Sequence, residues 1–185
     1  VICFDKNGEF ESEKTNQVMS ERLANTENAV IPGFYGAMPN GQVKTFSRGG
    51  SDVTGSIVAR ALKADMYENW TDVSGFLMAD PRIVENPKAI DAITYKELRE
   101  LAYMGASVLH EDAIFPVREA GIPINIKNTN KPQDAGTLIV QNTSDDNVRT
   151  ITGVAGKKDF TVIGIEKAMM NSELGFCRKL LGVLE

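Results

Sequence analysis

The sequence predicts an α/β protein with a mostly parallel sheet that helices cover on both faces. Stretches with the helical spacing of apolar residues alternate along the chain with short apolar stretches typical of strands. The composition, with 42% hydrophobic and 24% charged residues, is close to the average of soluble globular proteins. These two observations favour a folded α/β domain over a disordered chain, a collagen or a coiled coil.

The first half of the chain contains five expected elements. In order, they are a helix over 12–23, a short buried strand over 29–31, an extended segment over 43–46, a helix after Gly49-Gly50, and a strand over 66–70. Pro32-Gly33 ends the first strand, and Asn40-Gly41 is typical of a tight turn. In the second helix, Val53, Ile57 and Ala61 share one face, which we expect to be buried.

Three further elements are expected before residue 140. They are a helix opened by Thr94-Tyr95-Lys96-Glu97, a helix over 112–120 closed by Gly121, and a strand in which Ile122, Ile124 and Ile126 alternate. Thr94 and Glu97 match a capping box, in which each side chain binds the backbone N–H of the other residue. Leu98, Leu101 and Ala102 are then expected to face a core.

The chain is expected to contain two units, 1–145 and 146–185, because the polar stretch over 141–147 has no periodicity and resembles a linker. The second unit should begin with strands over 150–155 and 160–165 and continue with a helix from about residue 172. Roughly 37 residues are too few for an independent core, so we expect this unit to be incomplete.

Charge and cysteine content limit the partners and the location. Twenty basic and 25 acidic residues give a net charge of −5, which provides no general attraction to nucleic acid. Cys3 and Cys177 show no disulfide-framework spacing, as expected in a reducing cytoplasm, and no apolar run approaches the roughly 20 residues of a membrane helix. The ends at Val1 and Glu185 resemble an interrupted strand and an interrupted helix, so we expect an excised part of a longer protein.

The first candidate site is Thr45-Phe46-Ser47-Arg48-Gly49-Gly50-Ser51-Asp52. Paired glycines let a ligand approach the backbone, and the helix that follows presents free amides to an anion. Arg48 can hold a carboxylate or phosphate, and Asp52 can orient a lysine or a metal ion. The alternative is a tight turn in which Ser51 or Asp52 caps the helix.

The second candidate site is Thr71-Asp72-Val73-Ser74-Gly75, at the end of a strand, with Asp80-Pro81-Arg82 shortly after it. Ligands of open α/β sheets lie beyond the carboxyl ends of the strands, and Arg82 can reach phosphates. The alternative is a polar loop in which Pro81 fixes a turn.

The sequence gives little support for a zinc site or for a catalytic Ser-His-Asp triad. His110 is the only histidine, and no second His or Cys stands at ligand spacing. No nucleophile-elbow motif accompanies it, so His110 is interpreted as structural or capping. The residues alone therefore indicate a cytosolic α/β protein with an anion-binding loop.

Several motifs, in order, resemble the aspartokinases of the amino-acid kinase family. They are Ile31-Pro32-Gly33-Phe34-Tyr35-Gly36, residues 46–52, residues 71–75, Asp80-Pro81-Arg82-Ile83-Val84 and residues 103–110. The resemblance covers most of residues 28–140, and several motifs in order are more specific than one glycine loop. It implies an amino-acid kinase fold, an αβα sandwich similar to carbamate kinase, of which residues 1–145 would be the C-terminal portion.

The resemblance implies ATP-dependent phosphorylation of the L-aspartate side-chain carboxylate, which opens lysine, threonine and methionine biosynthesis. Mg²⁺ would accompany ATP, and no metal site in the protein itself is implied. Arg48 and Asp52 would be catalytic, with Asp52 holding catalytic groups in place. The aspartate pocket would consist of Phe34, Thr45, Arg48, Gly49, Gly50 and Ser51. The nucleotide would contact Thr71, Asp72, Asp80 and Arg82.

Three departures from the aspartokinase pattern affect this assignment. Leu77 replaces a nucleotide-contacting Tyr of some members, and Ser107 replaces a Lys that many members place near the phosphates. The Lys-Phe-Gly-Gly loop that opens these kinases has no match, since Lys6 is followed by Asn7-Gly8. We therefore expect half of an active site, inactive by itself.

Residues 146–185 resemble the beginning of an ACT domain, an α+β module that senses amino acids. The stretch 160–165 fits its first strand, and Met170 with Gly175-Phe176 fits the start of its helix. The resemblance implies that Met170, Gly175 and Phe176 contact an effector, lysine or threonine, and that the complete protein is a homodimer or a higher homo-oligomer.

Two alternatives stay open at this point. One is another amino-acid kinase, such as a glutamate or uridylate kinase, although Arg48-Gly49-Gly50-Ser51-Asp52 before an ACT-like start argues against it. The other is a non-catalytic amino-acid-binding regulatory module, which would bind lysine or threonine without any nucleotide.

Overall fold

A computed structural model describes most of the chain. The described residues are 1–47, 49–103, 109, 111–143, 151–156, 158–159, 161–170 and 173–184. Arg48, Ser107 and His110 therefore lie outside the described residues, as does much of the predicted linker.

The core of the protein is a four-stranded mixed sheet. Its strand order is β3 (Tyr67–Thr71), β5 (Ile124–Asn128), β6 (Thr137–Val140) and β4 (Ala92–Thr94). The pairs β3–β5 and β4–β6 are parallel, whereas β5 and β6 form an antiparallel pair at the centre. The expected mostly parallel α/β sheet is thus confirmed with one exception, the hairpin that joins its two parallel pairs.

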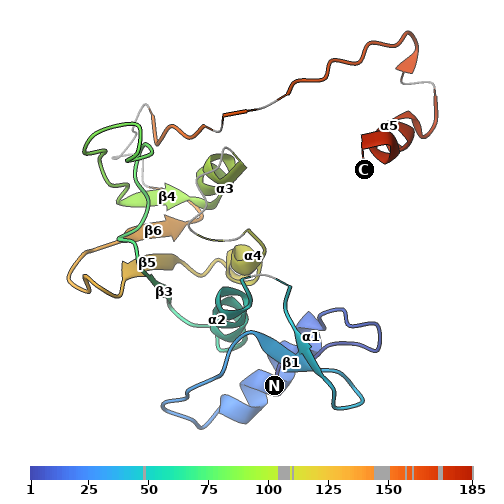
Figure 1. The fold of residues 1–185 in the computed structure, drawn as a ribbon. Helices are drawn as coiled ribbons and strands as arrows, with labels where there is room; N and C mark the ends of the chain where they lie inside the picture. Colours follow the sequence, from blue (N-terminus) through green and yellow to red (C-terminus); the bar gives the residue numbers. More distant parts are fainter. Residues whose placement is uncertain are drawn as a thin grey trace.

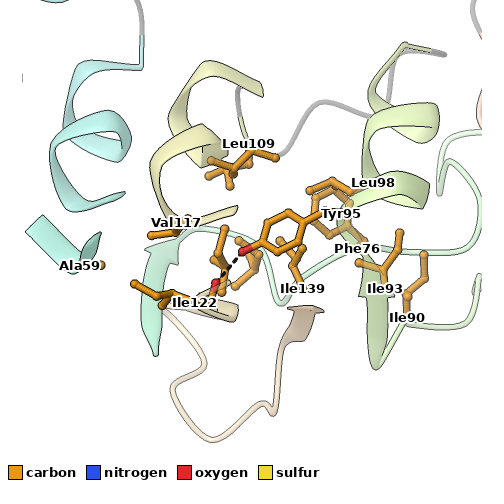
Figure 2. Close-up of a cluster of buried hydrophobic side chains, with 13 residues drawn as sticks. Ala59, Phe76, Ile90, Ile93, Tyr95, Leu98, Leu109, Val117, Ile122 and Ile139 are labelled. Atoms are coloured by element: carbon orange, nitrogen blue, oxygen red, sulfur yellow. Dashed lines mark hydrogen bonds between the residues drawn. The ribbon is translucent and has the colours of Figure 1, made fainter. Parts of the chain in front are cut away.

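Three helices lie against one face of this sheet, as Figures 1 and 2 show. They are α2 (Gly50–Ala61), α3 (Tyr95–Tyr103) and α4 (Glu111–Ala120). Ile124, Ile126 and Ile139 of the sheet are fully buried there. They belong to one hydrophobic cluster with Leu98 of α3 and Val117 of α4. Helices were expected on both faces, but in the described part of the chain these three pack against the same face.

A second hydrophobic cluster lies on the other side of α2. It is formed by the N-terminal segment, α1 (Ser12–Leu23) and the hairpin of β1 (Tyr35–Ala37) and β2 (Val43–Thr45). Ile57 and Ala61 of α2 belong to this second cluster, whereas Ala59 belongs to the sheet cluster. The predicted helix over 12–23 and the tight turn at Asn40-Gly41 are both confirmed.

The predicted buried strand over 29–31 is wrong. These residues form no strand, and the Val30 side chain is 99% exposed. Ala29 and Ile31 instead line a groove against Thr54 and Val58 of α2. Three apolar residues directly before a proline are too few to specify a strand partner.

The strands predicted over 150–155 and 160–165 are also wrong for the described residues. Residues 151–156 and 161–165 are extended without a strand ladder, and Val162 is 92% exposed. Val154 N–H donates to Met78 O at 2.7 Å, but α5 (Phe176–Leu184) lies apart from the body and buries no residue (Figure 1). An apolar pattern alone does not create a strand, because a strand needs a partner for its backbone groups. The boundary at 145 stays a prediction.

The capping box predicted at the start of α3 is confirmed. Glu97 N–H donates to Thr94 Oγ1 at 3.2 Å, and Thr94 N–H donates to Glu97 Oε2 at 2.9 Å. Burial acts to raise the pKa of Glu97, but hydrogen bonds from Thr152 and Thr94 outweigh it and lower the pKa below its usual value. This stabilisation is therefore present at neutral pH and is lost as the pH falls through the pKa of the folded state.

Replacing Thr94 by alanine is expected to lower the free energy of unfolding by about 1 kcal/mol, because the first turn of α3 loses its capping acceptor. A urea titration of the full-length gene product measures this change. Thr161→Ala, at an exposed position of the extended segment, serves as the control. Equal midpoints for both variants would contradict a stabilising cap.

Candidate active site

The glycine pair forms the start of α2 for two separate conformational reasons. Gly49 is the N-cap residue and has a left-handed backbone with φ 59°, which favours glycine. At Gly50, a Cβ atom would lie 2.5 Å from Phe34 Cδ2, so only glycine fits there. The alternative that Ser51 or Asp52 caps the helix is wrong, because Gly49 occupies that position without a side-chain cap.

Phe34 is held over this loop in an unusual conformation. Its φ of 82° is rare for a residue with a side chain. Phe34 N–H donates to Thr54 Oγ1 at 3.0 Å, and Phe46 N–H donates to Phe34 O at 3.0 Å. Phe34 is 47% exposed, and Thr45, the last residue of β2, pairs with Tyr35, which follows Phe34 in the chain. Strained residues of this kind concentrate at functional sites. The close approach of Phe34 to Gly50 and the pairing of Thr45 with Tyr35 bring the predicted pocket residues together. These residues are Phe34, Thr45, Gly49 and Gly50.

Asp52 lies in the first turn of α2 and reaches across to β3. Its Oδ1 accepts a hydrogen bond from Asn69 Nδ2 at 3.0 Å. Asn69 Nδ2 also donates to the Tyr67 hydroxyl at 2.9 Å, and that hydroxyl donates to the Asp52 backbone O at 3.3 Å. Sequence reasoning missed Tyr67 and Asn69. The available signal was an Asn at the centre of a predicted strand, where Asn is uncommon.

The carboxyl ends of the parallel strands β3 and β5 form the second part of the site. Thr71 ends β3 and is followed by Asp72 and Ser74; Thr71 O accepts a hydrogen bond from the Thr129 backbone N–H at 2.8 Å. The Ser74 hydroxyl donates to Asp134 Oδ2 at 2.6 Å and accepts from Asn128 Nδ2 at 2.9 Å. Asn128 and Asp134 were also missed, because they lie more than 50 residues from Ser74 in sequence.

The glycine loop and this strand edge are neighbours. Asn69 binds Asp52 of α2. Asn69 and Thr71 are two residues apart on β3, so their side chains point to the same face of the sheet, about 6.6 Å apart along the strand. The two candidate sites of the sequence therefore lie beside each other along β3.

Asp80 and Arg82 bind each other in an exposed turn. Arg82 Nη2 lies 2.6 Å from Asp80 Oδ2, and the Arg82 side chain is 87% exposed. Hydrogen bonds from Arg82, first from its side chain and then from its backbone, lower the pKa of Asp80 to about 2. A phosphate at Arg82 would have to compete with this carboxylate. Leu77, one of the departures noted above, pairs with Ala89 in an isolated antiparallel bridge.

Two of the predicted effector residues, Met170 and Gly175, precede α5 and the third begins it; α5 itself lies far from α2, the helix that follows the glycine pair (Figure 1). Gly175 has φ 79° and precedes α5, which begins at Phe176. Lys167 Nζ lies 5.0 Å from the centre of the Phe176 ring, and Met170 is half-buried. Their effector role stays a prediction.

The carboxylates of the site suit a metal ion that arrives with its own ligands. Among the described residues, no three His, Cys, Asp or Glu side chains gather as a metal cluster. Mg²⁺ in phosphoryl-transfer sites is held by one or two carboxylates together with substrate phosphates. Asp52 and Asp72 provide one carboxylate in each part of the candidate site.

A mixed α/β sheet, a glycine pair at a helix start and polar side chains at the carboxyl ends of parallel strands are typical of α/β proteins that bind phosphate groups. Comparison with known proteins narrows this class. The amino acid kinase family profile matches residues 4–128. The chain therefore belongs to the amino acid kinase family.

Several similar proteins are aspartate kinases. Aspartokinase 3 of Bacillus subtilis is 48% identical over 165 residues, which cover 89% of this chain and 36% of that protein. The crystal structure of Clostridium acetobutylicum aspartate kinase is 67% identical with a TM-score of 0.86, and it covers all of this chain and 42% of that one.

Escherichia coli aspartokinase III is 33% identical, and the match covers 78% of this chain and 34% of that one. Its complexes with lysine and aspartate and with aspartate and ADP give TM-scores of 0.71 and 0.69. The chain thus spans between 34% and 42% of the length of these relatives. Within the described residues, no helix is both long and apolar enough to cross a membrane.

Proposed function

We propose that this chain is part of an aspartate kinase, which transfers the γ-phosphoryl group of ATP to the side-chain carboxylate of L-aspartate. A carboxylate oxygen bonds to the γ-phosphorus, the bond from that phosphorus to the β,γ-bridging oxygen breaks, and ADP and 4-phospho-L-aspartate result. One observation carries the proposal: the Asp52–Asn69 hydrogen bond joins a glycine loop suited to an amino-acid carboxylate to a strand edge suited to a nucleotide.

The acceptor side of the proposed site is the glycine loop. Arg48 binds the α-carboxylate of aspartate, since a guanidinium forms two parallel hydrogen bonds with a carboxylate. The exposed Phe34 ring and Thr45 line the same pocket, and Gly49, Gly50 and Ser51 let the substrate approach the backbone. The complex of the related Escherichia coli enzyme with aspartate and ADP supports an aspartate substrate.

The donor side is the carboxyl edge of β3. Thr71, Asp72 and Asp80 contact the nucleotide, while Arg82 reaches its phosphates from the exposed turn. Asp52, between the two sides, holds the catalytic groups in place. Mg²⁺ bound with ATP would neutralise phosphate charge. The residues of the chain act mainly by positioning the two substrates, as is usual in phosphoryl transfer.

The regulation and assembly of the complete protein follow the same proposal. Met170, Gly175 and Phe176 contribute to an amino-acid effector site, for lysine or threonine, in a homodimeric or larger enzyme of the cytoplasm. The complex of the related Escherichia coli enzyme with lysine supports such an effector.

An ADP-release assay on the full-length gene product with Mg²⁺·ATP tests the proposed function. Aspartate is expected to stimulate ADP release, and glutamate, one methylene longer, is expected to serve poorly. Turnover with glutamate alone would favour another amino-acid kinase. Absence of turnover in a folded protein that still binds lysine or threonine would favour a regulatory module.

Replacing Arg48 by alanine is expected to raise the KM for aspartate by about tenfold or more, because the α-carboxylate loses its charged partner. The KM for ATP should change little. Steady-state kinetics in both substrates separate these effects, with Arg22→Ala on the exposed surface of α1 as the control. Unchanged aspartate kinetics would refute this role.

A further inference from the structure

We propose that Asn69 is a positioning residue that fixes the Asp52 carboxylate at the start of α2, an inference that rests on the proposed function. Nothing in the motifs that resemble the aspartokinases points to this residue. The inference comes from its chemistry, its burial and its hydrogen bonds.

Asn69 occupies a place where an apolar side chain would be expected. It lies at the centre of β3 and is only 7% exposed. Asparagine is depleted in strands, and a buried amide without partners is costly. A buried Asn at this point is therefore stable only if both N–H groups are satisfied. They are, because Nδ2 donates to Asp52 Oδ1 at 3.0 Å and to the Tyr67 hydroxyl at 2.9 Å.

Tyr67 attaches the main chain of the same turn to β3. Its hydroxyl donates to the Asp52 backbone O at 3.3 Å. Burial raises the pKa of Tyr67, and the nearby Asp52 charge adds to this effect, whereas the hydrogen bond from Asn69 acts in the opposite direction. The net effect is a raised pKa, so the hydroxyl stays protonated and can donate. The ring fits beside α2 because residue 55 is glycine; a Cβ there would lie 2.7 Å from the hydroxyl oxygen. Asp52 is thus held through both its side chain and its backbone.

The choice of a neutral donor has a chemical consequence. An amide orients the Asp52 carboxylate without cancelling its charge, whereas an Arg or Lys in the same place would form an ion pair. Among the described residues, no hydrogen bond is formed by the other carboxylate oxygen, Oδ2. A carboxylate with one fixed oxygen and a full negative charge is suited to orient a cationic catalytic group or Mg²⁺ bound to ATP.

A double-mutant cycle on the full-length gene product tests this inference. The four proteins are wild type, Asn69→Leu, Asp52→Ala and the double variant, each assayed for aspartate-dependent ADP release. Asn69→Leu is expected to lower kcat by about tenfold, with both KM values changed less than about twofold. In the Asp52→Ala background the same replacement should have no further effect on kcat, because the group that it positions is absent.

A matched control is available on the neighbouring strand. Asn125 on β5 belongs to the opposite face of the sheet, and its buried Oδ1 has no hydrogen-bond partner among the described residues. Asn125→Leu makes the same chemical change and is expected to leave kcat unchanged. Equal losses of kcat from Asn69→Leu in both Asp52 backgrounds would show a merely structural role and overturn the inference, as would unchanged kcat.

Two further measurements keep the inference separate from the proposed function. Asn69→Asp preserves the shape of the side chain but places a second carboxylate against Asp52; it should reduce kcat at least as much and replaces Asn69→Leu if that variant misfolds. The free energies of unfolding of the same four proteins report the Asn69–Asp52 contact independently of activity. Clear coupling without aspartate turnover would refute only the proposed function, whereas zero coupling would overturn the inference.

Discussion

Replacing Asp52 by alanine is expected to lower kcat by about 100- to 1000-fold, while the KM for ATP changes little. Asp52 is half-buried beside the glycine loop and is oriented by Asn69. Groups that are preorganised toward developing charge act mainly in the transition state, and loss of one typically has an effect of this size. Gly49 is the N-cap of α2, so the helix does not depend on Asp52 for its cap.

The measurement is steady-state kinetics of the full-length gene product with ATP and aspartate varied separately. Asp65→Ala, an exposed acid in the turn after α2, is the control for loss of a negative charge. A fall in kcat matched by an equal loss of ATP binding would indicate that Asp52 maintains the structure of the site instead.

Replacing Gly136 by alanine is expected to lower the free energy of unfolding by about 4 kcal/mol or more. Gly136 precedes β6 and has φ 81°, and a Cβ atom would overlap the carbonyl oxygen of Ile126. That oxygen belongs to the backbone of β5, whose Ile126 is paired with Thr137. The clash can be relieved only by opening the central hairpin of the sheet.

Gly41 provides a matched control, because its φ of 83° is nearly the same but no atom lies within 4 Å of the position that a Cβ would take. Gly41→Ala should therefore cost only the backbone strain, about 1–2 kcal/mol. Thermal and urea unfolding midpoints of both variants separate strain from overlap. Similar shifts for the two replacements would contradict the close approach of Gly136 to β5.

Local patterns predicted much of this fold. Helical spacing identified α2, a polar stretch indicated α1, the capping box identified α3, and Asn40-Gly41 identified the first hairpin. The strands β4 and β6 were missed because three or four residues carry too short a pattern. The segment 29–31 has the composition of a strand, but strand formation depends on a partner that composition does not specify.

The candidate site likewise contains residues that local sequence predicts and contacts that it does not predict. Gly49, Gly50 and Thr71 are found from local sequence, because a glycine pair before a helix and a polar residue after a strand have local causes. The contacts of Asp52 with Asn69 and of Ser74 with Asp134 join segments that are distant in the chain. Only the folded sheet brings such residues together, so no local pattern reports them.

The central hairpin of the sheet has a consequence for the order of folding. The pairing of β5 with β6 closes a short loop, whereas β3 must cross a long stretch of chain before it meets β5. Because the entropy lost on closing a loop grows with its length, the hairpin can nucleate the sheet and β3 joins it later. Amide exchange during refolding should then protect Ile126 and Ile139 before Asn69, so that Asp52 would acquire its hydrogen-bond donor only in the last stage of folding.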